Sequence, residues 1–236
     1  MVMNLSALEY PMQRVFLGRI LGAIVLTQLG LGILFNAVLT APLFAEGGYL
    51  LHAAPAGLQL GMAVLVGLVG MVLALALAVL AWPVLAAHSP AMARVFLALT
   101  VVGMALSGVE QAGVLAMRDF SDSYMAAEGE QQALLASLSA TGALLRNGVH
   151  YIALMVAGMT LGVWYFCLLR FALLPWVLAA LGLVACALQL YAIAQPILGG
   201  VVPFVLLAPL ALAQLLMGGW LLAFGFRDSP PADPAA

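Results

Sequence analysis

Residues 103–118, GMALSGVEQAGVLAMR, and residues 146–151, RNGVHY, decide the fold of this chain. The first stretch is largely apolar but carries Glu110 and Gln111, and the second opens the next apolar run with Arg146 and His150. A charged residue in the middle of a membrane span costs ~3 kcal/mol on insertion scales, so such residues face protein and find partners. We therefore expect Glu110 to turn toward the interior of a helix bundle and to pair with Arg146 or His150.

The composition of the whole chain supports a membrane setting for this pair. Hydrophobic residues make up 66% of the 236-residue sequence and charged residues 7%, whereas soluble domains are about half apolar and a quarter charged. Apolar runs of about 18 residues or more recur, which is typical of spanning helices. The net charge of −2, without a basic cluster, indicates no nucleic-acid partner. The sequence predicts an all-α, polytopic transmembrane bundle in contact with membrane lipid.

Turn signals divide the chain into six expected spans that form one domain over residues 15–226. We place the spans at residues 15–40, 57–81, 93–117, 148–169, 171–194 and 201–226. Residues 1–14 are expected to be a cytoplasmic leader, and residues 227–236 a disordered cytoplasmic tail. Residues 118–147 are expected to be an outer loop with an amphipathic helix, and whether residues 131–145 form a lid or extend the fourth span stays open.

Several short signals refine the expected spans. Trp82 and Pro83 are expected to end the second span, because proline breaks helices and tryptophan favours the membrane interface. Pro203 and Pro209 predict a kink or a late helix start in the sixth span. Two small-residue pairs at G-x-x-x-G spacing predict close helix approach: Gly18 with Gly22, and Gly158 with Gly162.

Arginines predict the orientation in the membrane, since positive side chains concentrate on the cytoplasmic side. With six spans, two of the seven arginines, Arg118 and Arg146, fall on one side of the membrane. The other five fall on the opposite side: Arg14, Arg19, Arg94, Arg170 and Arg227. Both termini are therefore expected in the cytoplasm. Glu110 then lies ~10 Å below the outer boundary at Arg118, in the outer half of a ~30 Å hydrocarbon layer.

The polar residues expected in this outer half admit more than one interpretation. Gln111, Tyr151, Asn36 and Gln59 are candidates to join Glu110, Arg146 and His150 in one polar cluster. In one interpretation the cluster only orders the bundle, because intramembrane polar groups serve packing as well as function. In the favoured one it lines a pocket that binds or passes a small or lipid-like ligand, or the protein is an accessory subunit of a larger assembly.

The alternative is a membrane-embedded enzyme that uses Glu110 and His150 as acid and base of a hydrolase-type reaction, or with a metal. His52 could complete a metal site of two histidines and one carboxylate with Glu110 and His150, a ligand set suited to zinc or iron. No close ligand spacing such as H-x-x-x-H supports this metal set, and no nucleophile elbow accompanies the serines. The cofactor, the ligand and the oligomeric state therefore stay unassigned.

One resemblance follows from the order of these features. Arg19 precedes a small-residue span, Arg94 opens the stretch that reaches Glu110, His150 opens the fourth span, and a tight turn runs from Arg170 to Pro175-Trp176. This order resembles a bacterial six-span membrane family catalogued as domain of unknown function 4386. Tyr151 stands where the family pattern would place an acidic residue. The resemblance implies a six-span architecture in the bacterial inner membrane and carries no reaction with it.

Overall fold

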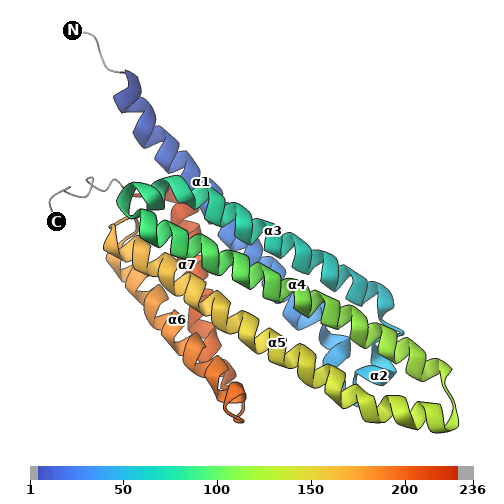
Figure 1. Cartoon of the computed structure of the whole chain (residues 1–236). Coiled ribbons are helices and arrows are strands. Elements are labelled where there is room, and N and C mark those ends of the chain that lie inside the picture. Colours follow the sequence, from blue (N-terminus) through green and yellow to red (C-terminus); the bar gives the residue numbers. More distant parts are fainter. Residues whose placement is uncertain (1–4, 228–236) are drawn as a thin grey trace. The chain divides into compact units, whose positions relative to one another are not determined.

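The computed structural model describes residues 5–227 of the chain, with side chains from Gln13 onward. Helices are the only regular elements among these residues (Figure 1). In chain order they are α1 Leu5–Ile33, the π-helical turn η1 Leu34–Leu39, the 3₁₀ turn η2 Ala41–Phe44, α2 Tyr49–His52, α3 Gly57–His88, α4 Pro90–Ala126, α5 Gly129–Arg170, α6 Trp176–Ile197, the 3₁₀ turn η3 Phe204–Leu207 and α7 Ala208–Phe224.

Six segments of the described chain are long and apolar enough to cross a membrane, which confirms the predicted six-span, all-α class. Their bounds are Gln13–Leu39, Gly57–His88, Pro90–Ala126, Gly129–Arg170, Trp176–Ile197 and Phe204–Phe224. The predicted late start of the last helix is also confirmed, because α7 begins at Ala208 after a 3₁₀ turn, with proline in its first turn. Proline fits there because the first N–H groups of a helix have no intrahelical partner.

Residues 118–147, predicted as an outer loop with an amphipathic helix, are helical almost throughout. Helix α4 continues to Ala126, α5 begins at Gly129, and only residues 127 and 128 separate them. Gly129 has a φ of 57°, a backbone conformation that glycine adopts without strain. Residues 131–145 thus extend the fourth span. The segment is polar, but polarity does not exclude a helix, and its alanine, leucine, glutamine and glutamate content favours one.

One further predicted boundary is wrong. Helix α3 continues past Trp82-Pro83 to His88, with Pro83 inside the helix. Helix α1 begins at Leu5, within the segment predicted as a leader. Proline removes one backbone hydrogen bond, yet spanning helices tolerate it because the neighbouring turns remain satisfied. The predicted disordered tail lies outside the described residues, apart from Arg227.

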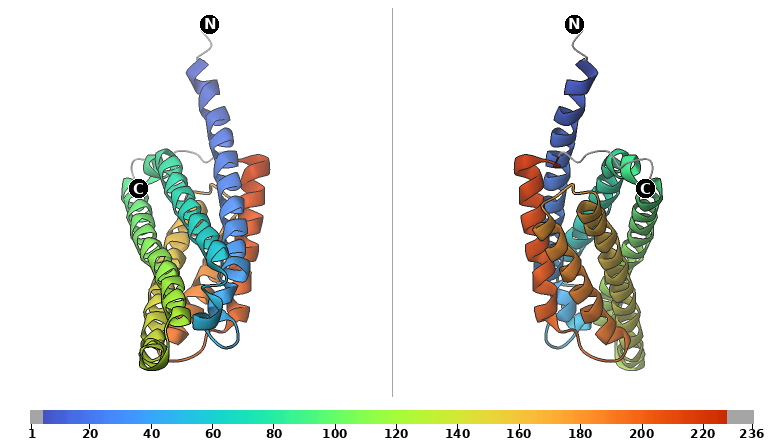
Figure 2. Two further views of the ribbon diagram at one scale, coloured as in Figure 1. Left: turned by 90° about the vertical axis from the view of Figure 1, so that its right-hand side faces the viewer. Right: turned by 90° about the vertical axis from the view of Figure 1, so that its left-hand side faces the viewer.

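By backbone contacts the chain forms two compact units, each of which contains part of α3, α4 and α5. The first comprises residues 1–29, 73–102 and 155–236, and the second comprises residues 30–72 and 103–154. In the first unit, α6 and α7 lie side by side in both views of Figure 2. Its core contains Trp164, which stacks on Phe96 and donates its Nε1–H to the Sδ atom of Met217 at 3.3 Å.

Small residues set the helix spacing in the first unit, as the G-x-x-x-G pairs predict. A Cβ atom on Gly22 would lie 2.5 Å from the backbone nitrogen of Leu222, so α1 and α7 touch through their main chains. A Cβ atom on Gly158 would lie 2.9 Å from a methyl group of Leu190 on α6. The closest approach is one that the motifs did not indicate: a Cβ atom on Gly182 would lie 2.1 Å from the Tyr165 ring.

The second unit contains all the candidate site residues. Residues 40–56, which we call the cap segment, pack on α4 through a small apolar core that includes Leu43, Tyr49 and Val114. Ser121 of α4 is fully buried and ties this segment down, because its Oγ donates to the Leu50 carbonyl and accepts the Ala54 N–H, both at 2.8 Å.

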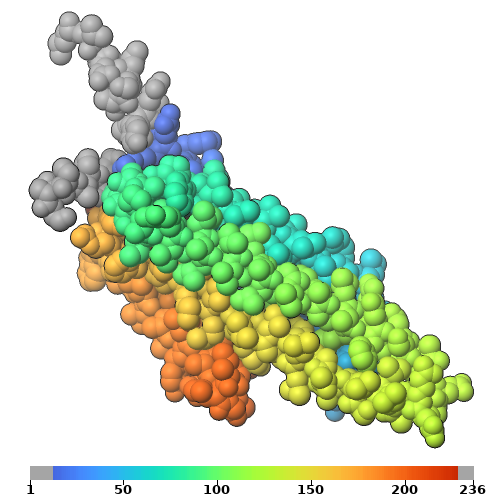
Figure 3. Space-filling view, in the orientation of Figure 1, coloured from blue at the N-terminus to red at the C-terminus, as the bar shows by residue number. Residues whose placement is uncertain are grey.

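A second tie connects the cap segment to α5, where the Tyr49 hydroxyl donates to the carbonyl oxygen of Ser139 at 3.0 Å. Neither Ser121 nor Tyr49, whose side chains make these hydrogen bonds, is among the residues predicted to form the polar cluster. The second half of α4, in green to yellow-green, and the first half of α5, in yellow, lie side by side in this unit (Figure 3).

Candidate functional site

Glu110 and two residues of α5 form one buried ionic cluster. Glu110, on α4, is 6% exposed, and its Oε1 accepts a hydrogen bond from Nη2 of Arg146 at 2.8 Å. The Nδ1 atom of His150 lies 2.9 Å from the same oxygen, a hydrogen bond in which Nδ1 donates when it carries the ring proton. Arg146 and His150 are four residues apart on a helix and so share one face. The expected pairing of Glu110 with Arg146 or His150 is therefore present with both residues at once.

Arg146 is held on three sides. Its side-chain stem lies against Gly113, where a Cβ atom would be 3.1 Å from Cγ of Arg146. The guanidinium carbon lies 5.3 Å from the ring centroid of Phe44, a distance typical of a cation–π contact. Nη1 donates to Oδ1 of Asn147 at 3.3 Å. The Nε atom is buried and has no hydrogen-bond partner among the described residues.

The charge balance of the cluster depends on one proton. Glu110 contributes one negative and Arg146 one positive charge, so the pair is neutral and a protonated His150 makes the cluster cationic. Both partners face the same carboxylate oxygen and stabilise its ionised form, which repays part of the cost of burying it. His150 is the accessible member, with 20% of its side chain exposed against 3% for Arg146.

The other predicted cluster residues lie at varying places in the same unit. The Gln111 amide is buried against the backbone of Gly67, and its Oε1 has no partner among the described residues. The Tyr151 ring lies 6.0 Å from the His150 ring. Asn36, in η1, donates a hydrogen bond from Nδ2 to the carbonyl oxygen of Gly32 in α1 at 3.0 Å.

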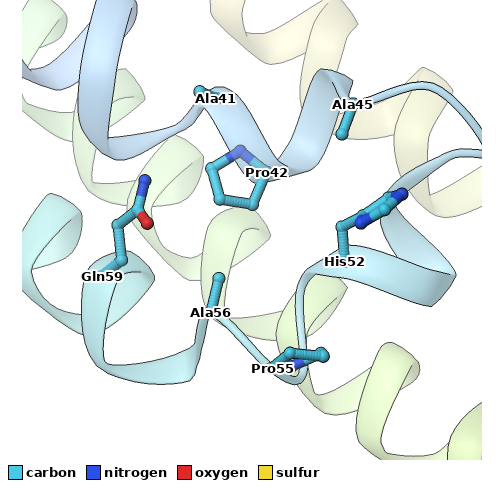
Figure 4. Close-up of a pocket in the computed structure, with 7 residues that line it drawn as sticks. All are labelled: Ala41, Pro42, Ala45, His52, Pro55, Ala56 and Gln59. Carbon is cyan, nitrogen blue, oxygen red and sulfur yellow. The ribbon is translucent and has the colours of Figure 1, made fainter.

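Gln59 belongs to a separate, shallow cavity of about 470 Å³. Ala41, Pro42 and Ala45 form one side of it, and four residues of the following chain form the other (Figure 4): His52, Pro55, Ala56 and Gln59. The amide nitrogen of Gln59 donates to the Val38 carbonyl at 2.8 Å. The lining of this cavity does not include Glu110, Arg146 or His150, and six of its seven residues belong to the cap segment.

The structure does not assemble the predicted metal set of His52, Glu110 and His150. No group of three histidine, cysteine, aspartate or glutamate side chains within residues 13–227 could hold a metal ion. His52 lines the cavity and its Nε2 lies 2.7 Å from the Glu46 carbonyl oxygen. The sequence indicates that His52 lies between the first two spans, but the direction of its side chain depends on the turn before α2.

The residues that complete this site carried little signal in the sequence. Phe44 is one aromatic residue among many at the end of a span, and Gly113 is one of 24 glycines. Ser121 was one of several serines with no distinguishing neighbour. The contacts of Phe44 and Ser121 join residues more than 60 positions apart in the chain, and that of Gly113 joins it to Arg146, 33 positions later.

Comparison with known families supports the architecture and supplies no reaction. The model of a family described as "Domain of unknown function (DUF4386)" matches residues 20–225 of the chain. The chain belongs to this family. The match covers most of the first apolar segment, all of the other five, and the Glu110, Arg146 and His150 cluster. A comparison with curated proteins found no match, and a comparison with solved structures found none.

In this DUF4386 protein, three serines of α4 and α5 donate hydrogen bonds to backbone carbonyl oxygens. Ser121 donates to Leu50 of the cap segment, whereas Ser137 and Ser139 donate to carbonyl oxygens three residues back on α5. The enzyme interpretation therefore has an acid–base pair, Glu110 with His150, and gains no further support from a positioned nucleophile. What the cluster offers is hydrogen-bond donors next to a paired carboxylate.

Proposed function

We propose that this protein binds a lipid-like ligand at the cluster formed by Glu110, Arg146 and His150, with the polar head of the ligand accepting hydrogen bonds from Arg146 and His150. One observation supports this above the others: the Nε–H donor of Arg146 is buried and has no acceptor among the described residues. An unsatisfied buried donor costs ~1–3 kcal/mol, and more when the group is charged. A ligand oxygen at this position would recover that cost.

The setting of the cluster selects the kind of ligand. Its residues belong to apolar helices that are able to span a membrane, so a ligand that reaches them arrives through the hydrocarbon phase and carries apolar chain. A head group that accepts hydrogen bonds complements Arg146 Nε, and the partly exposed His150 offers a second donor when it is protonated. In our proposal the cluster lies in the outer half of the bacterial inner membrane, with both termini in the cytoplasm.

Photo-crosslinking in lipid nanodiscs tests the proposal. The probes are palmitic acid with a diazirine in its chain, and a monoacylglycerol with the same chain. We expect one of them to label peptides from residues 30–72 or 103–154, and excess unlabelled probe to compete. The substitution Arg146→Gln should abolish this labelling, whereas Arg94→Gln, which changes an exposed arginine of the same helix bundle, should leave it intact.

A second variant separates loss of binding from loss of folding. Because Arg146 is buried, Arg146→Gln could unfold the second unit, so His150→Gln is measured beside it, at the most exposed position of the cluster. Reduced labelling in a His150→Gln protein with unchanged melting temperature supports the proposal. Labelling that neither substitution alters, or none that unlabelled probe displaces, refutes it and leaves the cluster as an element that orders the helices.

A further inference from the structure

The 3₁₀ turn η2 takes part in both the cavity and the ionic cluster. Ala41 and Pro42 of the turn, with Ala45 just after it, line the cavity, whereas Phe44, which does not line it, places its ring over the guanidinium of Arg146. One short segment thus forms part of the cavity wall and also covers Arg146.

We propose that Phe44 is the residue that controls access to Arg146, and that a ligand enters from the cavity side when the Phe44 ring swings away. This inference rests on the proposed function for the identity of the ligand. It adds the route of entry and the residue that controls which polar head groups reach Arg146. A cation–π contact keeps a guanidinium covered while leaving its N–H groups free to donate within the plane.

The exposures of neighbouring residues show which part of the cap segment is free to move. Leu43 is 4% exposed and belongs to the apolar core, so it anchors the turn. Phe44 is 59% exposed, and within residues 13–227 its ring contacts the guanidinium of Arg146 and stacks on no other aromatic ring. Its ring can therefore rotate without opening the core. Arg146, by contrast, is 4% exposed, so a small movement of its cover changes its accessibility greatly.

The backbone next to η2 makes a turn that depends on glycine. Gly47 and Gly48 follow the turn with φ values of 91° and 85°, which other residues adopt only with strain. Beyond them, the Ser121 and Tyr49 hydrogen bonds fix the rest of the cap segment to α4 and α5. The segment thus has a fixed end and a glycine pair next to its covering residue.

Arginine modification by phenylglyoxal in nanodiscs tests the cover without any ligand. The modification of Arg146 is measured by peptide mass spectrometry relative to Arg118, whose side chain is 33% exposed in the same unit. In the native chain the ratio should be low. Phe44→Ala should raise it roughly tenfold, the size expected when a desolvated cation–π cover is lost. Phe204→Ala, which removes a 75% exposed ring from the other unit, should leave the ratio unchanged.

A larger ring guards against a trivial result. Phe44→Trp retains the cover, and tryptophan is the best cation–π partner, so its ratio should equal or fall below that of the native chain. An increase with both substitutions would mean that any change loosens the segment, and would overturn the inference. An unchanged ratio in Phe44→Ala would overturn it as well.

The proposed function fails by a separate route. If Phe44→Ala exposes Arg146 to phenylglyoxal and neither diazirine probe labels the second unit in any variant, the covering role of Phe44 is supported and ligand binding is refuted. If the probes label the native chain and Phe44→Ala changes neither labelling rate nor arginine modification, ligand binding is supported and the covering role of Phe44 is refuted.

Discussion

Removal of the Glu110 carboxylate should destabilise the protein far more than removal of an exposed carboxylate at an equal distance from its partner. Glu110 lies 2.8 Å from Arg146, with side-chain exposures of 8% and 3%. Asp119 lies 2.8 Å from Arg118, with exposures of 65% and 33%. The two pairs thus match in distance and differ in burial, so they isolate the effect of the surroundings.

The expected magnitude follows from what each change leaves behind. At 2.8 Å and an effective dielectric constant of 20, the gross attraction of the buried pair is about 6 kcal/mol, most of it offset by desolvation. Glu110→Ala strands a buried guanidinium and should cost about 3–5 kcal/mol. For a chain of this size that corresponds to a fall in melting temperature of roughly 6–20 °C. Asp119→Ala breaks an exposed pair and should cost no more than about 1 kcal/mol.

The double variant Glu110→Ala/Arg146→Met gives the sharper measurement. Since both charges then disappear together, its loss should be much smaller than the sum of the two single losses, by about 3 kcal/mol. The assay is thermal or denaturant unfolding of each variant in the same nanodiscs. Losses that add within error, or an Asp119→Ala loss as large as that of Glu110→Ala, would refute the reasoning.

The identity of the substituted residue should matter in the same direction. Glu110→Gln retains the shape and one acceptor oxygen, whereas Glu110→Lys places an ammonium group beside Arg146 and His150. The glutamine variant should therefore express and melt closer to the native protein. Equal expression and melting temperature for both would mean that position 110 faces water.

Three other outcomes are expected. Gly182→Ala should cost at least about 3 kcal/mol in unfolding, because its Cβ would lie 2.1 Å from the fully buried Tyr165 ring, whereas Gly219→Ala meets no atom within 4 Å and should be neutral or slightly stabilising. Ser121→Ala removes both hydrogen bonds to the cap segment and should cost about 2 kcal/mol, with faster hydrogen exchange limited to residues 49–56 as the check. Burial raises the pKa of Tyr49, so the folded state holds this proton more tightly; its contribution to stability is complete below pH ~10, is lost as the pH rises above the folded pKa, and should vanish in Tyr49→Phe when unfolding is followed between pH 8 and pH 11.

Helix length shows where sequence reasoning reaches its limit. The apolar runs identified six spans because hydrocarbon demands about 20 apolar residues per crossing. The same rule gave no information on how far α4 and α5 continue beyond the apolar run. Residues 118–146 are polar enough for water and yet helical except at residues 127 and 128, so hydropathy alone placed them outside the spans.

Two features follow from the sequence. Glu110 needs basic partners because a carboxylate is costly in an apolar span, and Arg146 and His150 share a helix face because residues four apart align on a helix. The packing of the helices adds that Arg146 and His150 meet the same oxygen of Glu110, that Gly113 makes room for Arg146, and that Phe44 covers it. Those contacts join segments that are distant in the chain. Their geometry depends on helix packing and on the course of a short turn, which no local pattern encodes.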